Sequence, residues 1–179
     1  MLKRRIGTFN CQGLKLCVSK LQMLANDFVN YRMSALCIQE THLPGRGVEN
    51  IVSSTGEQLY LHYSGHATDS INGVGIILDT NKLAHFKPIS DRICQIETKI
   101  NNNQQLTLIS AYAPTLEKSE KNPDVRDNFY NSLNSVVTAV KRRNFLIVAG
   151  DYNAKTGSAF KSELYSANLG KYGKGSLHQ

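Results

Sequence analysis

The chain has 179 residues, a length that fits one domain and leaves little room for a second. Apolar residues make up 41% of the sequence and charged residues 20%, a balance that excludes a disordered chain, a collagen and a coiled coil. With 21 Lys and Arg against 14 Asp and Glu, the formal charge is +7, which favours a polyanionic partner such as nucleic acid without requiring one.

The first part of the chain predicts a strand, a helix and a second strand. Arg5–Asn10 has the pattern of a short strand with a polar end. Apolar residues recur at helical spacing over about Ser19–Arg32, which indicates an amphipathic helix. The apolar run Ala35–Ile38 fits a strand that is buried on both faces and ends at Gln39-Glu40. This order of elements is typical of a β-α-β unit.

The middle of the chain predicts an antiparallel meander. Short strand-like runs alternate here with turn sequences, of which Asn101-Asn102-Asn103 is the clearest hairpin connection. Strands that are separated by such short turns commonly pair with their neighbours in the sequence. The expected strands are Gln58–Tyr63, Gly73–Asp79, Ala84–Ile89, Ile93–Ile100 and Leu106–Tyr112.

A second helix and a further strand are expected next. Asn122 suits an N-cap and Pro123 suits the first helical position, and an apolar stripe follows them. Phe145–Ala149 is a continuous apolar run, which we interpret as a buried strand ending at Gly150-Asp151. Residues 154–179 are rich in Gly, Ser and Lys and predict no strand.

The cysteines and the apolar runs indicate in which cellular compartment the protein is expected. Cys11, Cys17, Cys37 and Cys94 form no C-x-x-C pair, so we do not expect a zinc site. Free thiols within apolar runs are typical of a reduced, intracellular protein. No apolar run approaches the roughly 20 residues that span a bilayer, so we expect no membrane partner.

Three of the predicted strands end in polar side chains, namely Asn10, Glu40, and Asp151 with Asn153. In open α/β sheets, sites form beyond the carboxyl ends of the strands, where rigid strands hold the side chains and loops admit the substrate. A Glu and an Asp brought together there are hard oxygen ligands suited to Mg²⁺ or Mn²⁺. Strands also end in polar residues simply because they reach the surface, so this pattern alone leaves both interpretations open.

Four motifs resemble those of the endonuclease/exonuclease/phosphatase superfamily, and they occur in the same order. Thr8–Leu14 (TFNCQGL) resembles its opening T-x-N-x-x-G-L motif, and Ile38–His42 (IQETH) resembles its Q-E-T/H motif. Ser110–Pro114 (SAYAP) resembles its Y-A-P motif, and Gly150–Ala154 (GDYNA) its G-D-F-N motif. With Gly170–Gly175 (GKYGKG), the set is most similar to the apurinic/apyrimidinic-endonuclease-like domains of LINE-type non-LTR retrotransposons.

This resemblance implies an α/β fold, a four-layer α/β/β/α sandwich of two mixed sheets (DNase I-like), and a Mg²⁺- or Mn²⁺-dependent endonuclease that nicks DNA. On the matching positions, Glu40 would be the main metal ligand, with Asn10 beside it to position metal or phosphate. Asp151 would orient or deprotonate the attacking water, and Asn153 would hold Asp151 or the scissile phosphate. Tyr112 would hydrogen-bond a phosphate oxygen or assist the leaving group. The chemistry is coherent, because a metal neutralises charge on the phosphodiester while a carboxylate activates water.

Three cations are candidates for contacts with nucleic acid. Arg92 matches a recurring S-x-R-I segment of the retrotransposon domains and would contact a phosphate, or else it is a surface Arg at the start of a strand. Lys171 and Lys174 lie among glycines, which let a nucleic-acid backbone approach closely, or they belong to a solvated tail. We expect His42 to face away from Glu40 unless the chain turns there.

The resemblance covers nearly the whole chain but not the last motifs of the family. A second Asp and a terminal S-D-H would fall beyond Gln179. We therefore predict one domain over residues 1–179, incomplete at its C-terminal end, monomeric, intracellular and nuclear, and impaired or unstable alone. A reverse transcriptase domain in the full-length parent is a candidate partner. The alternatives are a phosphomonoesterase of the same superfamily and a non-catalytic relic that binds nucleic acid.

Overall fold

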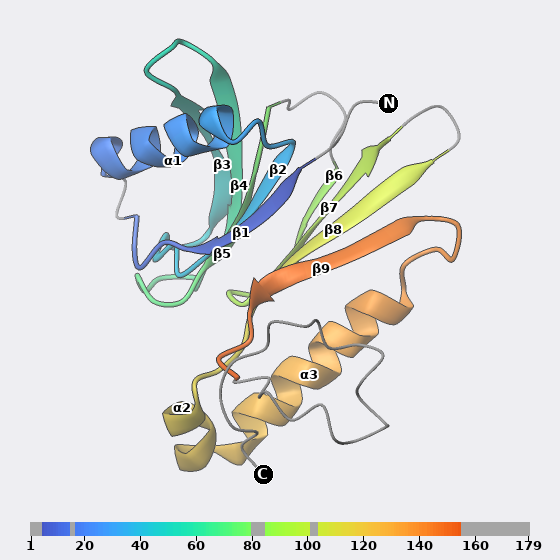
Figure 1. Cartoon of the computed structure of the whole chain (residues 1–179). Helices are drawn as coiled ribbons and strands as arrows, with labels where there is room; N and C mark the ends of the chain where they lie inside the picture. Colours follow the sequence, from blue (N-terminus) through green and yellow to red (C-terminus); the bar gives the residue numbers. More distant parts are fainter. Residues whose placement is uncertain (1–4, 15–16, 80–84, 101–103, 155–179) are drawn as a thin grey trace, which may run out of the picture.

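Two β-sheets pack face to face, and each sheet carries a helix packed on its outer side (Figure 1). The computed structural model describes residues 5–14, 17–79, 85–100 and 104–154. In these residues the first sheet has the strand order β1-β2-β5-β4-β3 and the second the order β6-β7-β8-β9. The four-layer α/β/β/α sandwich of two mixed sheets predicted from the sequence is confirmed.

The first sheet begins with the predicted β-α-β unit. Strands β1 and β2 pair in parallel, and the helix α1 (Val18–Asn30) lies between them in the sequence. The antiparallel strands β5, β4 and β3 follow in the sheet, and β3 was not predicted. The strands are β1 (Ile6–Asn10), β2 (Ala35–Gln39), β3 (Arg46–Val52), β4 (Gln58–Ser64) and β5 (Val74–Leu78).

The second sheet contains two antiparallel hairpins and one parallel strand. Strands β6, β7 and β8 pair with their sequence neighbours, whereas β9 runs parallel to β8 after the helices α2 (Leu116–Lys121) and α3 (Pro123–Thr138). The predicted meander is therefore divided between the sheets, because β4 and β5 belong to the first sheet whereas β6, β7 and β8 belong to the second. The strands are β6 (His85–Pro88), β7 (Ile93–Lys99), β8 (Gln105–Tyr112) and β9 (Phe145–Asp151).

Three apolar layers hold the sandwich together. The first lies between α1 and the first sheet and includes Phe28. The second lies between the sheets and includes Ile76 and Leu108. The third lies between α3 and the second sheet, where Phe129 and Leu133 pack against the strands. Among the described residues, no helix combines the length and the apolar character needed to cross a membrane.

Phe145–Ala149 lies within the strand β9, as predicted, but the prediction that this strand is buried is wrong. In the described residues β9 is the last strand of its sheet, so only one side of it is paired. Phe145 is 52% exposed, Leu146 36% and Ile147 37%. The continuous apolar run that suggested a central strand therefore belongs to an edge strand. β1 is likewise an edge strand, and its Phe9 is 53% exposed.

Candidate active site

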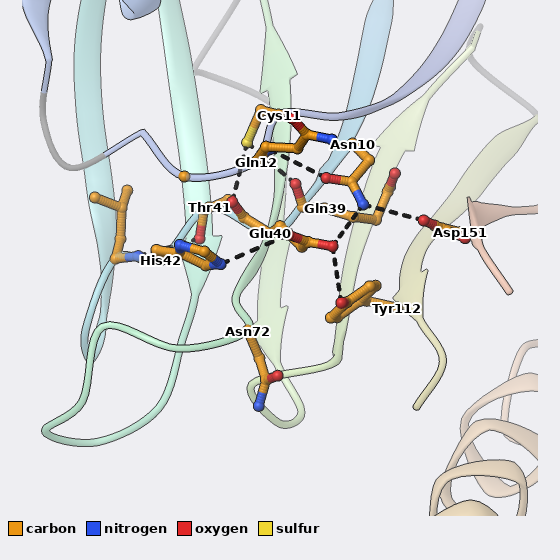
Figure 2. A network of polar contacts seen from close by, with 12 residues as sticks. Asn10, Cys11, Gln12, Gln39, Glu40, Thr41, His42, Asn72, Tyr112 and Asp151 are labelled. Atoms are coloured by element: carbon orange, nitrogen blue, oxygen red, sulfur yellow. Dashed lines mark hydrogen bonds and ion pairs between the residues drawn. The ribbon is translucent and has the colours of Figure 1, made fainter. Parts of the chain in front are cut away.

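Four of the predicted side chains meet where the two sheets approach each other (Figure 2). Asn10 is the last residue of β1, and Glu40 directly follows β2 in the same sheet. Tyr112 and Asp151 are the last residues of β8 and β9, and they are paired across the second sheet. Each side chain therefore extends from the carboxyl end of a strand, as expected for a site in an α/β protein.

The amide of Asn10 joins two carboxylates that come from different sheets. Its Nδ2 atom donates to Glu40 Oε1 at 2.8 Å and to Asp151 Oδ2 at 3.0 Å. Its Oδ1 atom accepts the backbone N–H of Gln12 at 3.1 Å. Because a carboxylate is an acceptor, the NH₂ group rather than the oxygen of Asn10 must face the two acids. The amide therefore separates two negative charges that would otherwise repel each other.

The chain turns sharply after β2, which brings His42 to Glu40. Both residues have φ +54°, in the left-handed region, and the turn packs against Gly73, which has φ +88°. His42 Nε2 lies 3.7 Å from Glu40 Oε2. We expected His42 to face away from Glu40 if this segment were extended. Because the chain turns here, the two side chains lie on the same side. The side chain of Glu40 remains 25% exposed, so a ligand can reach it.

Tyr112 is a buried phenol that donates to the same carboxylate. Its hydroxyl donates to Glu40 Oε1 at 2.8 Å. Burial and the neighbouring Glu40 carboxylate both disfavour the phenolate, and they raise the pKa of Tyr112 to about 12. The side chain is therefore a neutral hydrogen-bond donor at physiological pH, and it is poised to donate to an anionic oxygen.

Asp151 is oriented by the residues on either side of it. The backbone N–H of Asn153, which has φ +48°, donates to Asp151 Oδ1 at 2.9 Å. The side chain of Asn153 donates to the carbonyl of Ala113 at 2.7 Å, which ties the end of β9 to the segment after β8. A Cβ on Gly150 would lie 2.0 Å from the carbonyl oxygen of Ala111, so only glycine fits before Asp151.

Arg92 lies beside Tyr112 rather than on a remote surface. Its guanidinium carbon is 5.0 Å from the centre of the Tyr112 ring, and Nη1 donates to the Tyr112 carbonyl at 3.2 Å. Its Nη2 donates to Asn72 Oδ1 at 2.9 Å, and Lys118 Nζ donates to the same oxygen at 3.4 Å. Partial burial lowers the pKa of Arg92 from its usual value. Lys171 and Lys174 lie outside the described residues.

The oxygen atoms at this site suit a hard divalent cation. Mg²⁺ is usually bound by one or two carboxylates together with waters and substrate phosphates. Glu40 and Asp151 supply two carboxylates that one amide holds close together. Among the described residues, no three or more His, Cys, Asp and Glu side chains are grouped so that they could hold a metal ion by themselves. Asn10 would have to rotate its amide to offer Oδ1 to a metal.

Two residues at the site were not predicted. Gln39 is a buried amide in an otherwise apolar strand, and that exception was the available signal. Asn72 lies directly before Gly73, in the connection between two predicted strands. Its left-handed φ of +51° fits an Asn-Gly turn, but its side-chain contacts come from segments distant in sequence and left no local pattern.

No family model matches the chain. Craniofacial development protein 2 of Bos taurus is 27% identical over 156 residues, which are 86% of this chain and 24% of that protein. The chain thus spans about a quarter of the length of this curated relative.

Two solved structures share the fold. An AP endonuclease from Archaeoglobus fulgidus matches with a TM-score of 0.58 and 18% identity, over 87% of this chain and 59% of that one. The catalytic domain of Xenopus laevis APE2 matches with a TM-score of 0.58 and 13% identity, over 89% of this chain and 62% of that one. The architecture is therefore that of the DNase I-like fold.

Proposed function

We propose that this chain is a Mg²⁺- or Mn²⁺-dependent phosphodiesterase that nicks DNA, of the type that accompanies a reverse transcriptase in LINE retrotransposons. The observation that carries the proposal is the Asn10 amide, which holds Glu40 and Asp151 from two sheets within hydrogen-bond distance of one group. The similarity of the fold to an AP endonuclease and to the catalytic domain of APE2 supports it. The net charge of +7 favours a polyanionic substrate.

Each side chain has a distinct task in this proposal. Glu40 would hold the metal, and the metal would neutralise charge on the phosphate and stabilise the leaving oxygen. Asp151, held by the Asn153 N–H, would orient or deprotonate the attacking water. Tyr112 would donate a hydrogen bond to a phosphate oxygen or assist the leaving group. Asn10 would hold the two carboxylates at a fixed spacing. Arg92 would contact a backbone phosphate.

Nicking of a supercoiled plasmid by the purified chain tests the proposal. We expect slow, Mg²⁺-dependent conversion to the open circle. Glu40→Gln should reduce this rate at least about 100-fold, since even outer-shell partners of a metal typically contribute 10–100-fold. Glu120→Gln, an exposed glutamate on α2, is the matched control and should nick at the parent rate. Equal rates for the chain and for Glu40→Gln would contradict the proposal.

The same preparation separates the alternative functions. A phosphomonoesterase would release phosphate from 4-nitrophenyl phosphate faster than it nicks the plasmid. A non-catalytic relic would bind DNA in a salt-dependent manner without Mg²⁺-dependent turnover. Either result would replace the nuclease assignment.

A further inference from the structure

We propose that Gln39 and Ser110 are positioning residues that fix the spacing of the two sheets at the candidate active site. Their task is to keep the hydroxyl of Tyr112 within reach of Glu40. The inference rests on the proposed function, because it concerns the geometry that cleavage of a phosphodiester would require. It assigns a part in the reaction to two buried side chains that a substrate does not touch.

Gln39 is an amide in the otherwise largely apolar layer between the sheets. On the fully buried strand β2, Ala35 and Cys37 belong to the layer that faces the second sheet. Side chains alternate along a strand, so Gln39 lies on the same face as these two residues, and it is 1% exposed. An apolar side chain here would avoid the free-energy cost of burying an amide. Packing alone therefore does not explain the residue.

The side chain of Gln39 joins the first sheet to the second through Ser110. Its Nε2 atom donates to Ser110 Oγ at 3.1 Å, and Ser110 is a fully buried residue of β8. The hydroxyl of Ser110 donates back to the Ile38 carbonyl of the first sheet at 3.2 Å. We call the Gln39 amide, the Ser110 hydroxyl and the Ile38 carbonyl the buried polar bridge.

The partners of the Gln39 amide fix its orientation. A carbonyl can only accept, so the single hydroxyl hydrogen of Ser110 is used at Ile38. Ser110 must therefore accept from Gln39, which directs the NH₂ group toward β8 and leaves Oε1 for another donor. That donor is the hydroxyl of Thr8 on β1, at 3.2 Å. The bridge has one satisfied arrangement, so a change in the spacing of the sheets would break it.

The bridge lies directly beside the contact between Tyr112 and Glu40. Glu40 follows Gln39 in the sequence, and Tyr112 lies two residues after Ser110 on the same face of β8. The 2.8 Å hydrogen bond from Tyr112 to Glu40 also crosses from the second sheet to the first (Figure 2). Both crossings join the same two strand ends. The bridge therefore sets the distance that the Tyr112 hydroxyl has to span.

Removal of both ends of the bridge tests its role without leaving an unpaired amide. The double variant Gln39→Met/Ser110→Ala replaces both polar side chains by apolar ones, a change that can be close to neutral for stability. We expect it to nick plasmid about tenfold more slowly than the parent, at the lower end of the range for outer-shell residues of a metal site. Cys94→Ala is the control, because it removes volume from the same layer, opposite Ser110, and retains the bridge. It should nick at the parent rate.

Combination with Tyr112→Phe shows whether the bridge acts through the tyrosine. Tyr112→Phe removes the hydroxyl that reaches Glu40, so the bridge then has no such contact to position. In this background, the loss of the bridge should slow nicking by less than about twofold, because coupled residues have non-additive effects. A tenfold loss in this background would overturn the inference, as would nicking at the parent rate by Gln39→Met/Ser110→Ala.

Urea denaturation of the same four proteins, without metal, gives a readout that needs no turnover. With the bridge present, Tyr112→Phe removes a hydrogen bond to a carboxylate and lowers the free energy of unfolding. Without the bridge the hydroxyl is no longer held against Glu40, so the same substitution should lower the free energy of unfolding by less. Equal losses with and without the bridge would overturn the inference.

The two readouts distinguish this inference from the proposed function. Non-additive losses of stability in a chain that does not nick plasmid would support the positioning role and contradict the nuclease. Mg²⁺-dependent nicking by a chain whose losses of stability are additive would support the nuclease and contradict the positioning role.

Discussion

At Gly150, substitution by alanine should inactivate the site, because the added methyl group would displace the strand that carries Asp151. Gly150 pairs with Ala111 across β8 and β9, and Asp151 follows it directly. A Cβ at this position would lie 2.0 Å from the carbonyl oxygen of Ala111 and 2.8 Å from its carbonyl carbon. These are backbone atoms of a central strand, so they cannot move aside as the end of a flexible side chain would.

The geometry sets the size of the effect of Gly150→Ala. Ordinary contact begins at about 3.4 Å, so β9 must move away from β8 by roughly 1.4 Å at this point. The hydrogen bond from Asn10 to Asp151 is 3.0 Å long and would not survive such a shift. We expect a loss of about 1–3 kcal/mol in the free energy of unfolding, typical of overpacking. We expect nicking to fall about 100-fold, as for a comparable misplacement of a reacting group.

Two measurements on the same samples check this reasoning. Urea denaturation gives the free energy of unfolding, and plasmid nicking well below the unfolding midpoint gives the rate. Val148→Ala is the control, because it weakens packing under α3 on the same strand without changing the spacing of β8 and β9. Nicking by Gly150→Ala at the rate of Val148→Ala, or unchanged stability, would refute the argument.

Two further predictions concern the pH dependence of stability. Both ring nitrogens of buried His62 lack a partner in the described residues, and burial lowers the pKa of its imidazole. As the pH falls, the imidazole of His62 is protonated in the unfolded state before it is protonated in the folded state. The contribution of neutral His62 to the free energy of unfolding is therefore fully present above about pH 6.5 and declines on acidification. His62→Phe should remove this decline in urea titrations between pH 7 and pH 5, and a decline equal to that of the parent would contradict it. The raised pKa of Tyr112, about 12 against an ordinary 10, contributes stability below pH 10 that is lost between pH 10 and 12, and Tyr112→Phe should flatten denaturation midpoints across that window.

Periodicity in the sequence predicted the long elements and missed the short polar ones. The helices α1 and α3 were recovered because their apolar residues repeat at helical spacing. β3 was missed because its sequence, RGVENIV, combines a glycine and charges with few apolar residues, and pairing with β4 determines its conformation. α2 was missed because LEKSEK has one apolar residue and no face to bury.

The polar residues at the centre of the site could be predicted from the sequence, whereas the meeting of Lys118 with Asn72 could not. Asn10, Glu40 and Asp151 each end a strand, so the fold class alone places them at the same edge. Lys118 and Asn72 are 46 residues apart and meet only through the packing of the two sheets. No local sequence pattern predicts such a contact. The apolar run of β9 likewise gave no sign that one side of this strand is unpaired in the described residues.

A buried polar bridge explains how residues from two sheets can keep a fixed spacing. Gln39, 1% exposed, donates to the hydroxyl of Ser110 at 3.1 Å, and that hydroxyl donates to the Ile38 carbonyl at 3.2 Å. Apolar contacts are non-directional, whereas buried hydrogen bonds require a specific geometry and are costly to break. Glu40 directly follows Gln39, and Tyr112 lies two residues after Ser110 on the same strand. The bridge therefore fixes the two sheets relative to each other next to the point where Tyr112 must reach Glu40.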